Sequence, residues 1–104
     1  MQANWVYMTA ASKDEATHIG RELVSARLAA CVNIIEHMNS IYRWEGKMEE
    51  AAEVVLIAKT VESKVPQLIE KVKSMHSYSC PCIISLPIEA GNPEYLEWIK
   101  AEVQ

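Results

Sequence analysis

The chain has 104 residues, half of them apolar, which is enough for one domain with a single hydrophobic core and too few for two. Its formal net charge is −4 and its ten lysines and arginines are spread along the chain, which argues against nucleic acid or an anionic membrane as a partner. The first residues carry no secretion signal, and no apolar run approaches the ~18–20 residues of a membrane span, so we expect a cytoplasmic protein. Three cysteines are an odd count, which favours reduced thiols over a disulfide framework.

The first third of the chain predicts a strand, a helix and a second strand. Residues 5–8 form a short β-prone run, and Ser12 with Glu15 forms a capping box at the start of a helix. Apolar side chains recur at helical spacing as far as Ala30, which predicts an amphipathic helix of about four to five turns. Strand character resumes over 31–35. The interruption at 36–39 has no Gly or Pro and therefore suits a β-bulge.

The stretch 40–59 predicts two long β-strands joined by a tight turn at 45–47. Extended back to residue 31 and on to residue 60, each arm is about twice the usual ~5–6 residues of a strand. One small domain cannot cover such a hairpin. Its outer half, with Tyr42 and Trp44, would be an exposed aromatic edge unless another chain paired with it. We therefore interpret the hairpin as an oligomerisation arm and expect functional sites where subunits meet.

The remaining sequence predicts two helices with a strand between them. Ser63 as a cap and Pro66 in the first turn start a helix that must end by 76–79, because a proline follows at 81. Residues 82–88 predict the last strand, with its proline near an end or on an edge. The run Asn92-Pro93-Glu94 is a strong start for a third helix.

The element order β, α, β, β, α, β with an added C-terminal helix predicts one α+β domain over residues 1–104. Such an order is typical of the ferredoxin-like sandwich, in which an antiparallel sheet carries its helices on one face. That fold serves several functions. The sequence lacks the aromatic pattern of an RNA-recognition domain, the glycine-rich anion loop of an acylphosphatase and the M-x-C-x-x-C motif of a metallochaperone.

Six motifs then occur in order along almost the whole chain. They are TAASKDEA (9–16), RLAACVNI (27–34), SIYRWEGKMEE (40–50), LIAKT (56–60), MHSYSCP (75–81) and NPEYLEWI (92–99). In these motifs the chain resembles the CutA family of divalent cation tolerance proteins. The resemblance implies a ferredoxin-like subunit in a tight homotrimer whose long hairpins extend each other's sheets.

The resemblance also implies a response to copper and other divalent metals rather than catalysis of a reaction. The family's trimer is similar to the PII nitrogen-regulatory proteins, which bind small effectors in clefts between subunits. An alternative function is therefore that of a PII-like regulator which binds a small anionic ligand.

Three positions of the chain correspond to copper ligands proposed for bacterial relatives. A Cys near the end of the first strand and two His at the end of the second helix fall on Met8, Met75 and His76. Two thioethers and an imidazole suit Cu(I) better than Zn²⁺, because soft ligands select Cu(I). The alternative is that Met8 and Met75 fill the core.

Cys80-Pro81-Cys82 is a second candidate metal site. Residues i and i+2 of an extended segment share a face, so the two thiols are expected near each other and near His76. The sequence departs from the family pattern here, because the usual acidic residue at 82 is absent. The alternative is that both cysteines are small apolar side chains which fill a strand.

A third candidate is a polar cleft between subunits. Lys59 ends an apolar strand, where an ammonium group needs an anionic or polar partner. Side chains that can line a pocket for a small anionic ligand with it are His76, Tyr78, Trp44, Tyr42, Asn33 and Glu45. The alternative is that Lys59 pairs with a carboxylate such as Glu53 and that the aromatic residues are interface anchors.

Overall fold

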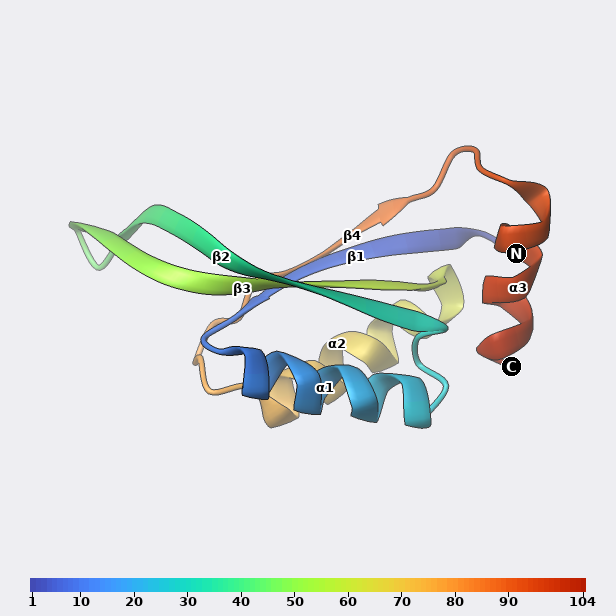
Figure 1. Ribbon diagram of the computed structural model, residues 1–104, viewed down its shortest axis with the longest axis horizontal. Helices are drawn as coiled ribbons and strands as arrows, with labels where there is room; N and C mark the ends of the chain where they lie inside the picture. Colours follow the sequence, from blue (N-terminus) through green and yellow to red (C-terminus); the bar gives the residue numbers. More distant parts are fainter.

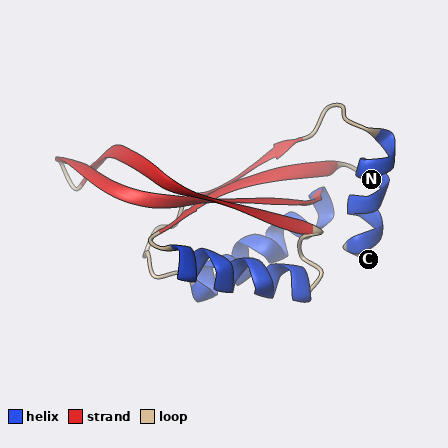
Figure 2. Cartoon of the chain, viewed as in Figure 1, coloured by secondary structure: helices blue, strands red, loops and turns tan.

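The computed structural model describes all 104 residues and contains a four-stranded antiparallel sheet with two helices on one face and a third helix at its end (Figures 1 and 2). The elements in order are β1 (Ala3–Ala10), α1 (Lys13–Ser25), β2 (Cys31–Trp44), β3 (Lys47–Val61), a 3₁₀ turn (Glu62–Lys64), α2 (Val65–Met75), β4 (Ile83–Pro87) and α3 (Pro93–Glu102). The strand order is β2-β3-β1-β4. This confirms the predicted ferredoxin-like α+β arrangement.

Helix α1 starts as predicted and ends earlier. The Ser12 hydroxyl accepts a hydrogen bond from the Glu15 N–H at 3.1 Å, while the Glu15 carboxylate accepts from the Ala11 N–H at 3.1 Å. The helix ends at Ser25, so the prediction of four to five turns reaching Ala30 was wrong. The reason is Arg27, whose φ of 58° lies in the left-handed region and stops the helix. Ala30 is buried in the loop that follows.

The hairpin of β2 and β3 closes with a two-residue turn. Glu45 and Gly46 both have positive φ, 50° and 79°, as in a type I′ turn, and Lys47 already pairs with Trp44. The predicted bulge is confirmed: Ile35 pairs with Val55 and Met38 with Glu53, which leaves two residues of β2 opposite one of β3.

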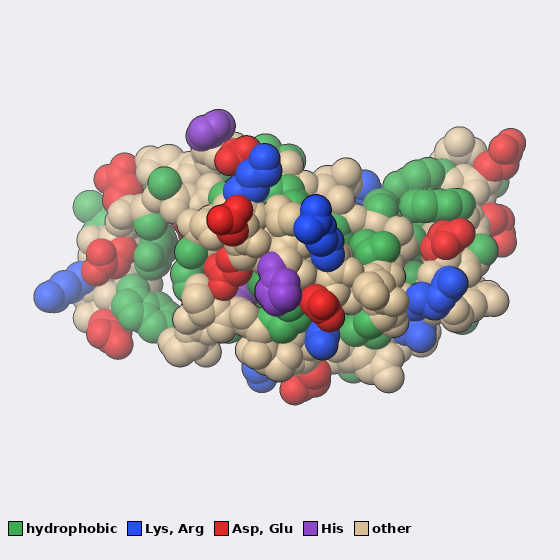
Figure 3. Space-filling view, turned by 60° about the horizontal axis from the view of Figure 1, so that its bottom comes forward, with side chains coloured by type: hydrophobic (Ala, Val, Ile, Leu, Met, Phe, Trp, Pro, Cys, Tyr) green, Lys and Arg blue, Asp and Glu red, His purple; other side chains and the backbone are tan.

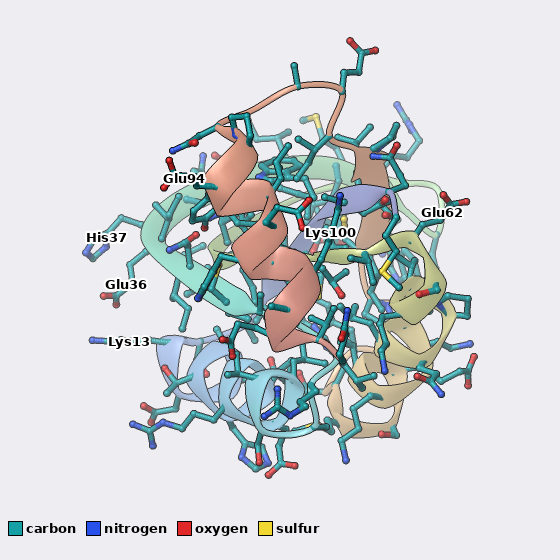
Figure 4. The ribbon with its side chains drawn as sticks, turned by 90° about the vertical axis from the view of Figure 1, so that its right-hand side faces the viewer. Lys13, Glu36, His37, Glu62, Glu94 and Lys100 are labelled. Atoms are coloured by element: carbon teal, nitrogen blue, oxygen red, sulfur yellow. The ribbon has the colours of Figure 1, made fainter.

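The outer half of the hairpin projects away from the body of the molecule (Figure 1). All ten residues from 41 to 50 are exposed. Among them Ile41, Trp44 and Met48 are 64%, 46% and 79% exposed. An ion pair between Lys13 at the start of α1 and Glu36 at the bulge joins the hairpin base to the helical layer, at 3.9 Å (Figure 4).

The second half of the chain follows the predictions with one correction. Pro66 lies in the first turn of α2, but the cap position is Lys64 rather than Ser63, because a 3₁₀ turn precedes the helix. The Asn92 side chain accepts from the Glu94 N–H at 3.1 Å and caps α3. Pro87 is the last residue of β4, which is an edge strand as predicted.

The main core lies between the sheet and helices α1 and α2. It contains Val6, Met8, Ala10, Ala16, Ile19, Leu23, Ala29, Val54, Leu56, Ala58, Leu68 and Val72. A smaller cluster packs α3 against the end of the sheet through Ala30, Val61, Ile99 and Val103. On the opposite face no helix covers β4, where Ile84 and Leu86 are 54% and 49% exposed. None of the helices has the length and apolar character needed to cross a membrane.

Candidate functional site

A pocket of about 600 Å³ lies where the projecting part of the hairpin meets the segment after α2. It is lined by β1, the hairpin arm and the 78–82 segment, through Tyr7, Thr9, Met38, Ser40, Ile41, Tyr42, Trp44, Glu53, Tyr78, Ser79, Cys80 and Cys82. Its volume falls within the ~300–1,000 Å³ typical of small-molecule sites. Glu53 is the only charged residue in the lining.

A hydrogen bond between Tyr78 and Glu53 forms the polar part of the pocket. The Tyr78 hydroxyl donates to Glu53 Oε2 at 2.8 Å. Burial, together with this hydrogen bond and the charge of Glu53, raises the pKa of Tyr78 well above its usual value of 10.0. Tyr78 therefore remains a neutral donor at physiological pH. Glu53 is half-buried and has no cationic side chain within ion-pair distance.

The His76 imidazole joins the end of α2 to the end of β1. Its Nδ1 accepts from the Tyr78 N–H at 3.0 Å, so the ring proton lies on Nε2, which donates to the Thr9 carbonyl at 2.8 Å. The side chain is 1% exposed. Both nitrogens are thus occupied, and a metal ion could bind His76 only by displacing one of these hydrogen bonds.

Glu15 lies beside this histidine and binds the same loop. Its Oε2 accepts from the Ser77 N–H at 2.7 Å and is 3.8 Å from His76 Nδ1. Burial opposes ionisation of Glu15, but the hydrogen bonds that its carboxylate accepts from Ala11 and Ser77 outweigh it and lower the pKa of the carboxyl. The carboxylate therefore fixes the loop that carries Tyr78 against the start of α1.

Of the predicted thioether ligands, one lies in the core and the other lies at its edge. Met8 is 1% exposed on β1, and Met75 packs against the same cluster of apolar side chains. A metal held by Met8, Met75 and His76 would have to enter this core and break a bond of the imidazole. The packing of Met8 and Met75 fits their alternative interpretation as core residues.

The cysteine pair lies in the pocket instead. Cys80 is exposed, Cys82 is half-buried, and neither forms a disulfide. Burial, and then the charge of Glu53, raises the pKa of the Cys82 thiol. No group of three or more His, Cys, Asp and Glu side chains in the chain is placed to hold a metal ion. The structure therefore does not assemble His76 with the two thiols into one metal site.

The residues predicted for the anionic cleft fall into separate places. Tyr42, Trp44 and Tyr78 are at or in the pocket. The Lys59 amine donates to Asn33 Oδ1 and forms no ion pair with a carboxylate. Lys59 lies six positions after Glu53 along β3, which is about 20 Å at ~3.3 Å per residue. Glu45 lies in the hairpin turn, away from both.

Two contacts of the site were absent from the sequence interpretation, namely Tyr78 with Glu53 and Glu15 with Ser77. One sequence signal could have indicated the first. Glu53 is a carboxylate within the otherwise apolar run from 51 to 58, and a half-buried acid in a strand requires a partner. The second contact depends on the path of the loop after α2, for which the sequence offers no spacing rule.

Comparisons with known proteins place this chain close to one family. The family description "CutA1 divalent ion tolerance protein" matches residues 4–102. The chain is 46% identical over 101 residues to the divalent-cation tolerance protein CutA of Archaeoglobus fulgidus, covering 97% of this chain and 98% of that protein. It is 52% identical over 93 residues to a CutA homolog of Xenopus laevis, covering 89% of this chain but only 62% of the longer relative.

Solved structures agree with these sequence matches. The structure of the A. fulgidus protein, described as a periplasmic divalent cation tolerance protein, superposes with a TM-score of 0.95 at 45% identity, covering 98% of this chain and 99% of that one. The structure of CutA1 from Oryza sativa has a TM-score of 0.96 at 42% identity and covers 100% of this chain and 95% of its own.

Proposed function

Because the chain belongs to the CutA1 divalent ion tolerance family, we propose that it is a non-enzymatic homotrimer that binds copper or a related divalent metal and contributes to tolerance of such metals. We place it in the cytoplasm, where its three free thiols would remain reduced. The names of the relatives describe tolerance of metals, and none of them describes a reaction.

The proposal that the chain forms a trimer rests on the projecting hairpin arm. An arm whose ten outermost residues are all exposed, with Ile41, Trp44 and Met48 among them, buries little apolar surface within its own chain. Figure 3 shows hydrophobic side chains between charged ones on this arm, at the left of the view, whereas the helical face carries mixed charges. Exposed strands of this length are stabilised by pairing with another chain. We therefore expect each arm to pack against a neighbouring subunit.

We assign the metal to the two thiols of the pocket, because the other soft group there, the Met38 thioether, already accepts a hydrogen bond from the Tyr7 hydroxyl at 3.4 Å. Thiolates select Cu(I), and Cys80 is exposed beside the half-buried Cys82. Of the three other candidates, Met8 is buried, Met75 is partly buried against the core, and both ring nitrogens of His76 are hydrogen-bonded. Copper would enter as cargo, and its binding would release the thiol protons.

Native mass spectrometry of metal-free protein, before and after addition of Cu(I) and Zn²⁺, tests both the trimeric assembly and the metal binding. We expect a trimer that retains Cu(I) in preference to Zn²⁺. Met48→Lys should shift the trimer towards monomer, while Val24→Lys, a matched change of an exposed apolar residue on α1, should not. A monomeric wild-type protein would refute the assembly.

Variants locate the metal. Cys80→Ser combined with Cys82→Ser should abolish copper retention, and Met8→Leu, which keeps an apolar side chain in the core, should preserve it. Loss of copper from Met8→Leu or His76→Ala with retention in the double serine variant would show that the thiol assignment is wrong. A trimer that retains neither metal would refute the metal-binding function.

A further inference from the structure

The pocket at the base of the hairpin arm has a chemical character that metal tolerance does not explain. Its walls carry four aromatic side chains, Tyr7, Tyr42, Trp44 and Tyr78, and one carboxylate, Glu53. No Lys, Arg or His is in its lining. The faces of aromatic rings carry negative electrostatic potential, so the rings and the carboxylate attract the same sign of charge.

Glu53 lacks the partner that a half-buried carboxylate requires. One of its oxygens accepts from the neutral Tyr78 hydroxyl at 2.8 Å, and no other hydrogen bond to it is present. No cationic side chain lies within 4.0 Å. Moving a carboxylate out of water costs free energy that a single neutral donor offsets only in part, and a cation would offset the rest.

From this charge and shape we propose that the pocket binds an organic cation, in which an ammonium group on an apolar body meets Glu53 and the aromatic walls. The volume of about 600 Å³ admits a small organic molecule. The exposed rings of Tyr42 and Trp44, 44% and 46% accessible, form the entrance.

Two other occupants fit the pocket less well. An anion would meet a carboxylate and aromatic faces without any basic residue to bind it. A hard metal ion requires several oxygen ligands, whereas Glu53 is the only carboxylate in the pocket and no set of three potential ligands converges there. The aromatic walls would attract an organic cation through cation–π interaction, which a neutral molecule of the same shape would lack.

The test compares two probes of similar shape that differ in charge. 2-Phenylethylammonium carries the cation, and 2-phenylethanol replaces it with a hydroxyl. Each is titrated into metal-free, ¹⁵N-labelled protein at neutral pH, and binding is followed by the indole N–H signals of the three tryptophans. We expect the ammonium probe to shift the signal of Trp44, leave Trp5 and Trp98 unchanged, and bind at least tenfold more tightly than the alcohol.

Glu53→Gln isolates the charge, because the amide keeps an acceptor for the Tyr78 hydroxyl. Binding of the ammonium probe should weaken about tenfold, and binding of the alcohol should not change. Glu62→Gln is the matched control: Glu62 is exposed beyond the end of β3, on the side of the start of α2 (Figure 4), and its substitution should leave both affinities unchanged.

Three results would overturn the proposal. The first is equal affinity for the two probes. The second is undiminished binding of the ammonium probe to Glu53→Gln. The third is the absence of saturable binding, which would mean that another part of the assembled protein fills the pocket. Benzyltrimethylammonium carries the charge but cannot donate a hydrogen bond, so it repeats the second test on charge alone: undiminished binding of this probe to Glu53→Gln would assign the affinity to the aromatic walls and would contradict the stated role of Glu53.

Discussion

Replacement of Glu15 by Gln tests whether a single carboxylate fixes the loop that carries the pocket. Its two oxygens accept from the Ala11 and Ser77 backbone N–H groups at 3.1 and 2.7 Å, and its side chain is 15% exposed. Hydrogen bonds to a charged acceptor contribute ~1.5–3 kcal/mol each, and Gln keeps one acceptor while it turns an amino group towards the other donor. We therefore expect the free energy of unfolding to fall by about 2 kcal/mol at neutral pH.

The same contacts make the stability loss of Glu15→Gln depend on pH. The pKa of Glu15 is lower in the folded chain than its usual value of 4.5, so its contribution is fully present above 4.5 and is lost as the pH falls through the folded-state pKa. The difference between wild type and Glu15→Gln should therefore be constant from neutral pH down to about 5 and should narrow in more acidic solution. Urea unfolding at one fixed protein concentration measures it, since assembly makes stability depend on concentration.

Glu22→Gln provides a matched control on the same helix. Its carboxylate is 46% exposed and 3.8 Å from the Lys71 amine, and surface ion pairs of this kind contribute ~0–1 kcal/mol. If Glu15→Gln cost no more than Glu22→Gln, or if the cost persisted unchanged in acid, the assigned role of the Glu15 hydrogen bonds would be wrong.

Three substitutions and one pH dependence test the turn, the core and the thiols. Gly46→Ala should lower the free energy of unfolding by about 1 kcal/mol in urea unfolding, because φ is 79° at this position. No atom lies within 4 Å of the added Cβ, so backbone strain is the only cause, and an unchanged stability would contradict it. Glu45→Asn should stabilise by a few tenths of a kcal/mol, since Asn favours the first position of a type I′ turn; a loss would argue against that turn. Leu68→Ala should cost ~2–5 kcal/mol, and a smaller cost would mean that the core refills the cavity. The raised pKa of the Cys82 thiol predicts that Cu(I) affinity, measured by competition with a chelator, rises with pH; a flat profile would exclude this thiol as a ligand.

The fold was predictable because most of its boundaries are set by local chemistry. Ser12 caps α1 and Asn92 caps α3 through hydrogen bonds to nearby backbone, so residue identity and spacing were sufficient. The end of α1 was not predictable in this way. Ala26 to Ala30 continue the apolar spacing of a helix, yet Arg27 adopts a left-handed backbone that its residue type disfavours. Tertiary packing of the following alanines, two of them buried, decides this boundary.

The candidate site depended on strand register, which the sequence constrains only loosely. Continuing the pairing of Ile35 with Val55 without a bulge would place His37 opposite Glu53, and the two could then form an ion pair. The bulge adds one residue to β2, so Met38 lies opposite Glu53 and His37, at φ 67°, is exposed (Figure 4). A bulge was predicted from residues 36–39, but its exact position decides whether the pocket contains a free carboxylate.

The pocket and the proposed assembly share residues, which links the two proposals thermodynamically. Tyr42 and Trp44 line the pocket and also lie on the arm that we expect to pack against a neighbouring subunit. If a cation binds the assembled form more tightly than the free chain, assembly must strengthen by the same factor, since coupling between two binding events is reciprocal. Sedimentation of the dissociating variant Met48→Lys with and without 2-phenylethylammonium measures this coupling. If the probe shifts Met48→Lys towards trimer, and this shift disappears when Glu53→Gln is added, the arm takes part in both assembly and cation binding. Identical sedimentation with and without the probe would show that cation binding and assembly are independent.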